Sequence, residues 1–85
     1  MIPSPLTKQE RLLNAFGDRL RQLRKARNLR QLDMERLGLS YKYYQRLEAG
    51  QVNPTLLTLY KLALAFEVPI SHLVCPEQDH DASAS

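Results

Sequence analysis

The chain has 85 residues, of which 44% are apolar and 25% are charged, so its length allows one small domain with a single core. Three Gly, no Trp and many Leu favour helices over a β-sandwich or a barrel. One Cys excludes an internal disulfide framework and fits a reducing compartment. No apolar run approaches the ~18 residues of a membrane span, and no basic segment precedes an apolar one as in a secretory signal. We therefore expect a cytoplasmic protein.

Charge is distributed unevenly along the chain. The net charge is +3, but residues 8–30 hold eight Lys and Arg against two acidic residues, and residues 75–85 hold three acidic residues and no basic one. Residues 1–74 alone carry 12 basic and 6 acidic side chains, a net charge of +6. A basic body suits a polyanionic partner, although a solvated helix face would give the same composition.

The first helix is expected at about 7–27, after a Pro-containing flexible arm at 1–6. Thr7 and Glu10 have the spacing of a capping box, in which a hydroxyl and a carboxylate satisfy early backbone N–H groups. Apolar residues then recur at steps of three and four, which indicates one helical stripe. The stripe consists of Leu12, Leu13, Phe16, Leu20, Leu23 and Ala26.

Four residues mark places where helices weaken or end. Gly17 interrupts the first apolar stripe and weakens the prediction locally. Asn28 is suited to a left-handed cap that ends the first helix. Gly38 allows a sharp turn at positive φ, and Gly50 ends a later helix.

Two short helices are expected at 30–37 and 41–48. The apolar residues of the first are Leu32, Met34 and Leu37. Ser40 is a good N-cap for the second, and Tyr44 and Leu47 point inward from it at a spacing of three. No strand pattern is present, so the predicted fold class is all-α.

Thr55 can cap a fourth helix at about 55–66, and residues 70–74 form a last turn or two. The inner stripe of the fourth helix is Leu56, Leu59, Leu62, Ala63 and Phe66. Residues 76–85 are polar and acidic, which predicts a disordered tail after one domain at 7–75.

The two short helices and the Gly-containing turn between them have the pattern of a helix-turn-helix, whose second helix reads base edges in the major groove. Three stretches in order, FGDRLRQLRKARNLRQ (16–31), GLSYKYYQRLEAG (38–50) and NPTLLTLYKLALAFEVPISHL (53–73), resemble the lambda-repressor-like (XRE) family. The resemblance spans about 70% of the chain. It implies a compact five-helix bundle that binds DNA, usually as a homodimer on an inverted repeat.

The resemblance also implies roles for individual residues. Base contacts would come from Tyr41, Lys42 and Arg46. DNA backbone or supporting contacts would come from Gln31, Ser40, Tyr43, Gln45 and Asn53, and Arg24 would pair with Glu48. Arg46 could contact either a guanine edge or a phosphate. Arg24 and Glu48 could instead be two solvated charges that do not pair.

The chain departs from the family pattern at three points. The 30–37 helix is one residue short. Met34 or Glu35 falls near a position that usually holds a small Ala, and Tyr44 replaces an aliphatic core residue. These departures bear on the angle and depth at which the 41–48 helix is presented more than on the fold.

Leu57 and Leu64, seven residues apart, lie off the inner stripe of their helix near Tyr60. With Ile70 and Val74 they predict an exposed apolar patch of the kind that marks interfaces, here between two copies of the chain. A locally apolar surface is the alternative interpretation.

The leading hypothesis is a sequence-specific transcriptional regulator of double-stranded DNA, of bacterial, phage or plasmid origin, without a cofactor. His72, Cys75 and His80 make a poor zinc set, so no metal is expected. No catalytic set or phosphate-binding loop is recognisable, so an enzyme is not expected. The alternative is an antitoxin-type protein-binding module with secondary DNA binding, whose toxin-wrapping segment would be 76–85.

Overall fold

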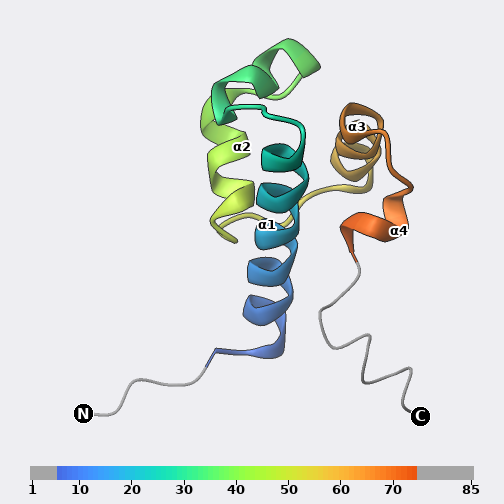
Figure 1. Ribbon diagram of the computed structural model, residues 1–85. Coiled ribbons are helices and arrows are strands. Elements are labelled where there is room, and N and C mark those ends of the chain that lie inside the picture. Colours follow the sequence, from blue (N-terminus) through green and yellow to red (C-terminus); the bar gives the residue numbers. More distant parts are fainter. Residues whose placement is uncertain (1–5, 75–85) are drawn as a thin grey trace.

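The computed structural model describes residues 6–74, which form five helices and no strands, and this confirms the predicted all-α fold. The helices are α1 (Lys8–Ala26), the 3₁₀ helix η1 (Gln31–Leu37), α2 (Tyr41–Glu48), α3 (Leu56–Phe66) and α4 (Ile70–Leu73). In Figure 1, α1 runs between α2 on one side and α3 with α4 on the other. The predicted tail, and all of the predicted arm except Leu6, lie outside the described residues. No helix within 6–74 has both the length and the apolar character needed to cross a bilayer.

Side-chain caps set where the helices begin. The Thr7 hydroxyl accepts from the Glu10 N–H at 3.0 Å, and the Glu10 carboxylate accepts from the Thr7 N–H at 2.8 Å, so the predicted capping box is confirmed. The hydroxyls of Ser40 and Thr55 each accept from the backbone N–H three residues later, at 3.2 and 3.1 Å. Each cap satisfies a donor that the first helical turn leaves unpaired.

Residues with left-handed φ follow four of the helices; Gly50, with φ 72°, follows α2, and three others follow α1, η1 and α3. Asn28 has φ 57° just after α1, as predicted, and Gly38 has φ 96° between η1 and α2. Glu67 also adopts φ 57° at the end of α3, which the sequence pattern did not indicate. Gly38 adopts this positive φ without strain, and it makes the turn between η1 and α2.

All five helices contribute buried residues to one core. Its buried members are Phe16, Leu20, Met34, Leu39, Tyr44, Leu47, Leu62, Ala63, Phe66 and Leu73. Tyr44 is fully buried, so its predicted core role is confirmed. The predicted stripes were too long, because Leu12, Ala26 and Leu56 are exposed. Burial on α1 begins only at Phe16, and Leu56 lies in the first turn of α3, where 74% of it remains uncovered.

Gly17 lies where the α1 backbone meets the C-terminal end of α2. A Cβ atom at this position would lie 2.2 Å from the Glu48 carbonyl oxygen and 2.9 Å from that of Leu47. Glycine has a low helix propensity, but the absence of a side chain at Gly17 lets the end of α2 pack directly on the α1 backbone. This contact fixes the separation of the two helices.

Candidate nucleic-acid interface

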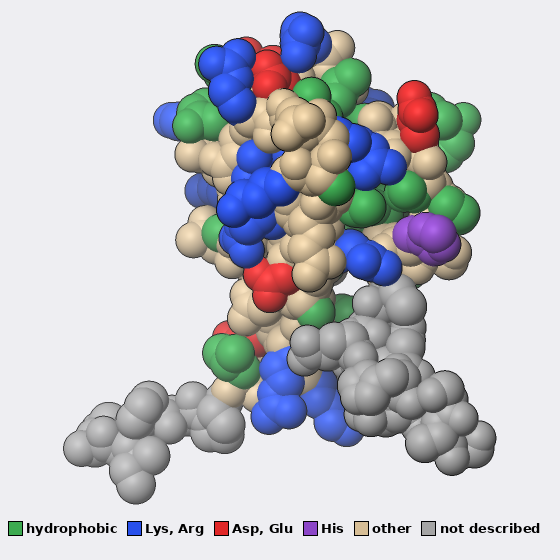
Figure 2. All heavy atoms as spheres, viewed as in Figure 1, with side chains coloured by type: hydrophobic (Ala, Val, Ile, Leu, Met, Phe, Trp, Pro, Cys, Tyr) green, Lys and Arg blue, Asp and Glu red, His purple; other side chains and the backbone are tan. Residues whose placement is uncertain are grey.

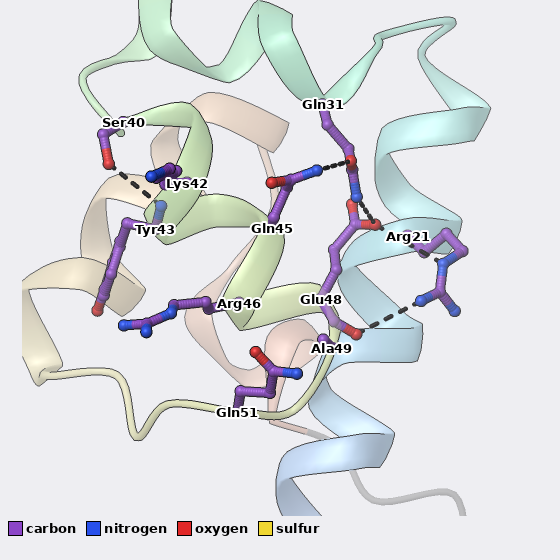
Figure 3. Close-up of a pocket in the computed structure, with 10 residues that line it drawn as sticks. All are labelled: Arg21, Gln31, Ser40, Lys42, Tyr43, Gln45, Arg46, Glu48, Ala49 and Gln51. Atoms are coloured by element: carbon purple, nitrogen blue, oxygen red, sulfur yellow. Dashed lines mark hydrogen bonds and ion pairs between the residues drawn. The ribbon is translucent and has the colours of Figure 1, made fainter.

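An open groove follows the solvent side of α2 and is closed at its edges by α1, η1 and the loop after α2 (Figure 3). Its lining residues are Arg21, Gln31, Ser40, Lys42, Tyr43, Gln45, Arg46, Glu48, Ala49 and Gln51. Six of the eight residues expected to contact or support DNA therefore line one surface. The other two, Tyr41 and Asn53, do not line it.

Lys42 and Arg46 are exposed one helical turn apart on α2, and both line the groove. Residues four apart share a helix face, which is the arrangement that the sequence pattern predicted for them. Tyr41 is half-buried, and its hydroxyl accepts from Gln45 Nε2 at 3.0 Å. The expected base-contact set thus divides into two solvent-facing cations and one tyrosine held by a neighbour.

A buried ion pair ties the C-terminal end of α2 to α1. Arg24 Nε donates to Glu48 Oε2 at 2.6 Å and Arg24 Nη2 donates to Glu48 Oε1 at 3.2 Å, while only 1% of the Glu48 side chain is exposed. Arg24 Nη1 also donates to the Leu29 carbonyl at 2.8 Å, just before η1. One guanidinium therefore joins three segments of the chain, as expected of a planar group with five donors.

Electrostatics in this cluster favour the ionised pair. Burial opposes ionisation of Glu48, but hydrogen bonds from Arg24 and Gln31 hold the pKa of its carboxyl below the ordinary value. The hydrogen bond to Glu48 raises the pKa of Arg24. Burial, reinforced by the neighbouring carboxylate, raises the pKa of Tyr44 well above its usual range. Both Glu48 and Arg24 are accordingly charged at neutral pH.

Hydrogen bonds through two side-chain amides connect the ion pair to the groove. Gln31 Nε2 donates to Glu48 Oε1 at 3.0 Å, and Gln45 Nε2 donates to Gln31 Oε1 at 3.4 Å (Figure 3). Gln31, which begins η1, is thereby held against α2. This position agrees with a supporting role, and its contact with phosphate stays a prediction.

The remaining predicted residues have distinct places. Ser40 caps α2 and lines the groove. The Tyr43 hydroxyl lies 3.4 Å from Thr58 Oγ1, which links α2 to α3. Asn53 is exposed in the loop before α3.

Sequence reasoning missed Arg21 and Gln51 as groove residues. Arg21 Nε lies 3.6 Å from Glu48 Oε1, and its Nη1 lies 2.9 Å from Asp18 Oδ1. Since Arg21 precedes Arg24 by three residues, helical spacing placed both on the face that meets Glu48. Gln51 follows α2 in a loop and had no such signal.

The groove carries excess positive charge. Arg21, Lys42 and Arg46 line it, whereas the one carboxylate in the lining, Glu48, is already paired with Arg24. Lys and Arg side chains also extend along α1 in Figure 2. Residues 6–74 carry a net charge of +6. Such a surface attracts a polyanion and favours phosphate contacts.

Apolar side chains on α3, on α4 and just after α4 are grouped as the α3 patch, defined by Leu56, Leu57, Tyr60, Leu64, Ile70 and Val74; Leu64 lines a separate depression with Leu37 and Ala65. Leu57, Tyr60 and Leu64 are each more than half exposed, and Val74 is also exposed. Ile70 is half-buried against the core and lines a shallow depression with Leu57 and Tyr60. Leu56, assigned to the core from sequence, joins this surface instead. Residues 6–74 contain no cluster of three metal-ligating side chains.

The chain resembles known proteins over this region. The helix-turn-helix family model matches residues 20–73. An uncharacterized HTH-type transcriptional regulator, y4dJ, of Sinorhizobium fredii is 41% identical over 64 residues, which is 74% of this chain and 83% of that protein.

Two solved structures share the fold. The restriction-modification controller protein C.AhdI of Aeromonas hydrophila superposes with a TM-score of 0.69 and 40% identity, over 72% of this chain and 94% of its own. A hypothetical transcription factor, NHTF, from Neisseria gives a TM-score of 0.77 at 23% identity, over 98% and 97% of the two chains.

Proposed function

The chain belongs to the XRE-type helix-turn-helix family, and from this premise we propose that it regulates transcription by binding a specific double-stranded DNA site as a homodimer on an inverted repeat. The observation that carries the proposal is the cationic groove along α2, in which exposed Lys42 and Arg46 share one face. Duplex DNA is the fitting partner because its major groove admits a helix, whereas that of RNA is too deep and narrow.

In this proposal α2 enters the major groove. Arg46 donates to a guanine edge and Lys42 to a neighbouring base, while Tyr41 contacts the site from the first turn of the helix. Gln31, Tyr43 and the loop with Asn53 face the phosphate backbone and set the register of the protein on the duplex. The names of the relatives, a transcriptional regulator and a restriction-modification controller, support this class of function.

Self-association would come from the α3 patch. Burying its exposed leucines and Tyr60 against the same surface of a second copy removes apolar area from water, at about 25 cal/mol per Å². A two-fold dimer places two α2 helices about one turn of DNA apart, roughly 34 Å. This arrangement explains why the proposed operator is an inverted repeat.

DNA binding is tested by selecting duplexes from a random pool and measuring affinity for the enriched sequence. We expect affinity to fall steeply with salt, because each neutralised phosphate releases a counterion. Arg46→Ala should cost about 1–3 kcal/mol and relax preference at one base pair. Lys25→Ala, an exposed cation outside the groove, is the matched control and should leave base preference intact. Failure to enrich any duplex would refute the proposal.

Dimerisation is tested by sedimentation of Leu57→Glu/Leu64→Glu, which should be a folded monomer with much weaker operator binding. Leu12→Glu is the control, because Leu12 is 51% exposed on α1 and lies outside the α3 patch. A wild-type chain that remains monomeric on its operator would contradict the dimer.

A further inference from the structure

A chain of hydrogen bonds leads from the buried ion pair to the groove and ends on Gln45. Glu48 Oε1 accepts from Gln31 Nε2 at 3.0 Å, and Gln31 Oε1 accepts from Gln45 Nε2 at 3.4 Å. The same Nε2 of Gln45 donates to the Tyr41 hydroxyl oxygen at 3.0 Å. Gln45 is exposed, and its amide oxygen points away from Gln31 (Figure 3).

The ionised Glu48 carboxylate sets which group donates and which accepts in each of these hydrogen bonds. An ionised carboxylate can only accept hydrogen bonds, so Gln31 must turn its NH₂ group toward Glu48. Its carbonyl oxygen then faces Gln45, which must in turn present its own NH₂ group. Reversing the Gln45 amide would set two carbonyl oxygens against each other. A buried charge therefore fixes which end of an exposed amide faces solvent.

Both N–H groups of Gln45 are used inside the protein. One donates to Gln31 and the other to Tyr41, which leaves the carbonyl oxygen as the group that Gln45 offers to the groove. An unconstrained glutamine would offer a donor and an acceptor and would rotate to suit either partner. The hydroxyl of Tyr41 does not fix the amide by itself, because a hydroxyl accepts or donates equally well.

We propose that Gln45 is a specificity-determining residue that acts as an acceptor only, and that Gln31 is the positioning residue that makes it so. This inference rests on the proposed DNA binding. An acceptor in the major groove selects a base with an exocyclic amine, which is N6 of adenine or N4 of cytosine. It disfavours guanine and thymine, whose O6 and O4 atoms are acceptors too. Because its NH₂ group is occupied, Gln45 accepts adenine and cytosine alike rather than pairing bidentately with adenine.

The test begins with the duplex that wild-type protein enriches from a random pool. Gln45→Ala identifies the base pair that Gln45 reads, as the one position where preference is lost. At that position wild-type protein should favour adenine and cytosine over guanine and thymine by about tenfold, the worth of one hydrogen bond to a base. Replacing adenine there by purine, which lacks the amine, should cost wild-type protein a similar factor.

Gln31→Met keeps the bulk of the side chain but breaks the chain of bonds. It should reduce the tenfold preference to near unity at that base pair alone, while Lys25→Met, at an exposed cation outside the groove, should retain it. A loss of affinity shared by all duplexes would reflect only a backbone contact and would not move the preference. A cooperative thermal unfolding transition of Gln31→Met would verify that it folds, and the purine duplex tests the inference without any variant.

The outcomes distinguish a failure of the proposed DNA binding from a failure of the Gln45 inference alone. Enrichment of no duplex overturns the proposed DNA binding and this inference with it. A specific duplex whose amine preference survives in Gln31→Met overturns the inference alone. So does a wild-type preference for guanine or thymine at the position that Gln45→Ala identifies.

Discussion

Replacing Arg24 by Met leaves the Glu48 carboxylate without its main partner in a site where 1% of its side chain is exposed. The least costly way to remove this unpaired buried charge is for the carboxylate to take up a proton. Neutralising a carboxyl whose ordinary pKa is 4.5 costs about 1.36 kcal/mol per pH unit, or about 3.4 kcal/mol at pH 7. This figure is an upper limit on the electrostatic cost, since Gln31 and Arg21 still face the carboxylate. We expect a destabilisation of about 2–3 kcal/mol at pH 7.

The sign of the pH dependence follows from the two folded states. In the wild type the pKa of Glu48 is lowered, so its contribution to stability is present above about 4.5 and is lost only as the pH falls below that value. In Arg24→Met burial raises the pKa of Glu48, so the variant gains stability as the pH falls from 7. At pH 5 protonation costs only about 0.7 kcal/mol, and the difference between the two proteins should shrink to about 1 kcal/mol or less.

Urea unfolding of both proteins at pH 7 and pH 5 measures this difference directly. Arg21→Met is the control, because Arg21 is 41% exposed and its Nε lies 3.6 Å from Glu48 Oε1, so it should cost under about 1 kcal/mol at either pH. A destabilisation by Arg24→Met that is equal at pH 7 and pH 5 would show that lost packing, not a stranded charge, is responsible.

Two further substitutions test the packing and the acid stability of the domain. Gly17→Ala should destabilise by about 1–2 kcal/mol in urea despite the better helix propensity of Ala, because its Cβ would meet the Glu48 backbone at 2.2 Å; unchanged or higher stability would refute the contact. The Arg30 side chain and then its backbone N–H lower the pKa of Asp33 to about 2, so its stabilisation is present above about 3.8 and is lost toward pH 2. Asp33→Asn should therefore lose less stability than wild type between pH 4 and pH 2 in urea unfolding, and parallel pH profiles would contradict this.

Most of the fold followed from local sequence signals. The capping residues Thr7, Ser40 and Thr55 and the left-handed Asn28 act through bonds to residues a few positions away, so spacing alone identified them. Burial was less predictable, because apolar periodicity shows which face of a helix is apolar but not how far its neighbours extend. Leu56 fits the α3 stripe and is nevertheless 74% exposed.

The site was predictable where it depends on one helix. The four-residue spacing of Lys42 and Arg46 guarantees a shared face on α2, and both line the groove. The Gln31–Gln45 contact joins two elements whose crossing depends on the length of η1 and the turn at Gly38. No pattern within either element indicates that the two amides meet, so only the structure reveals the direction of their bond.

The 3₁₀ geometry of η1 accounts for how Gln31 reaches α2 from a short helix. A 3₁₀ helix rises about 2.0 Å per residue and an α-helix about 1.5 Å, so the seven residues of η1 span about 14 Å, while an eight-residue α-helix spans about 12 Å. Winding η1 as a 3₁₀ helix would therefore make up for the one residue by which the family resemblance implies that it is short, without moving its ends together. Long 3₁₀ runs need support, and here Met34 is fully buried while Asp33 accepts from the Arg30 N–H at 2.7 Å. Since α2 is held independently through Glu48, the shortening is absorbed within η1, and Gln31 still reaches the carboxylate at 3.0 Å.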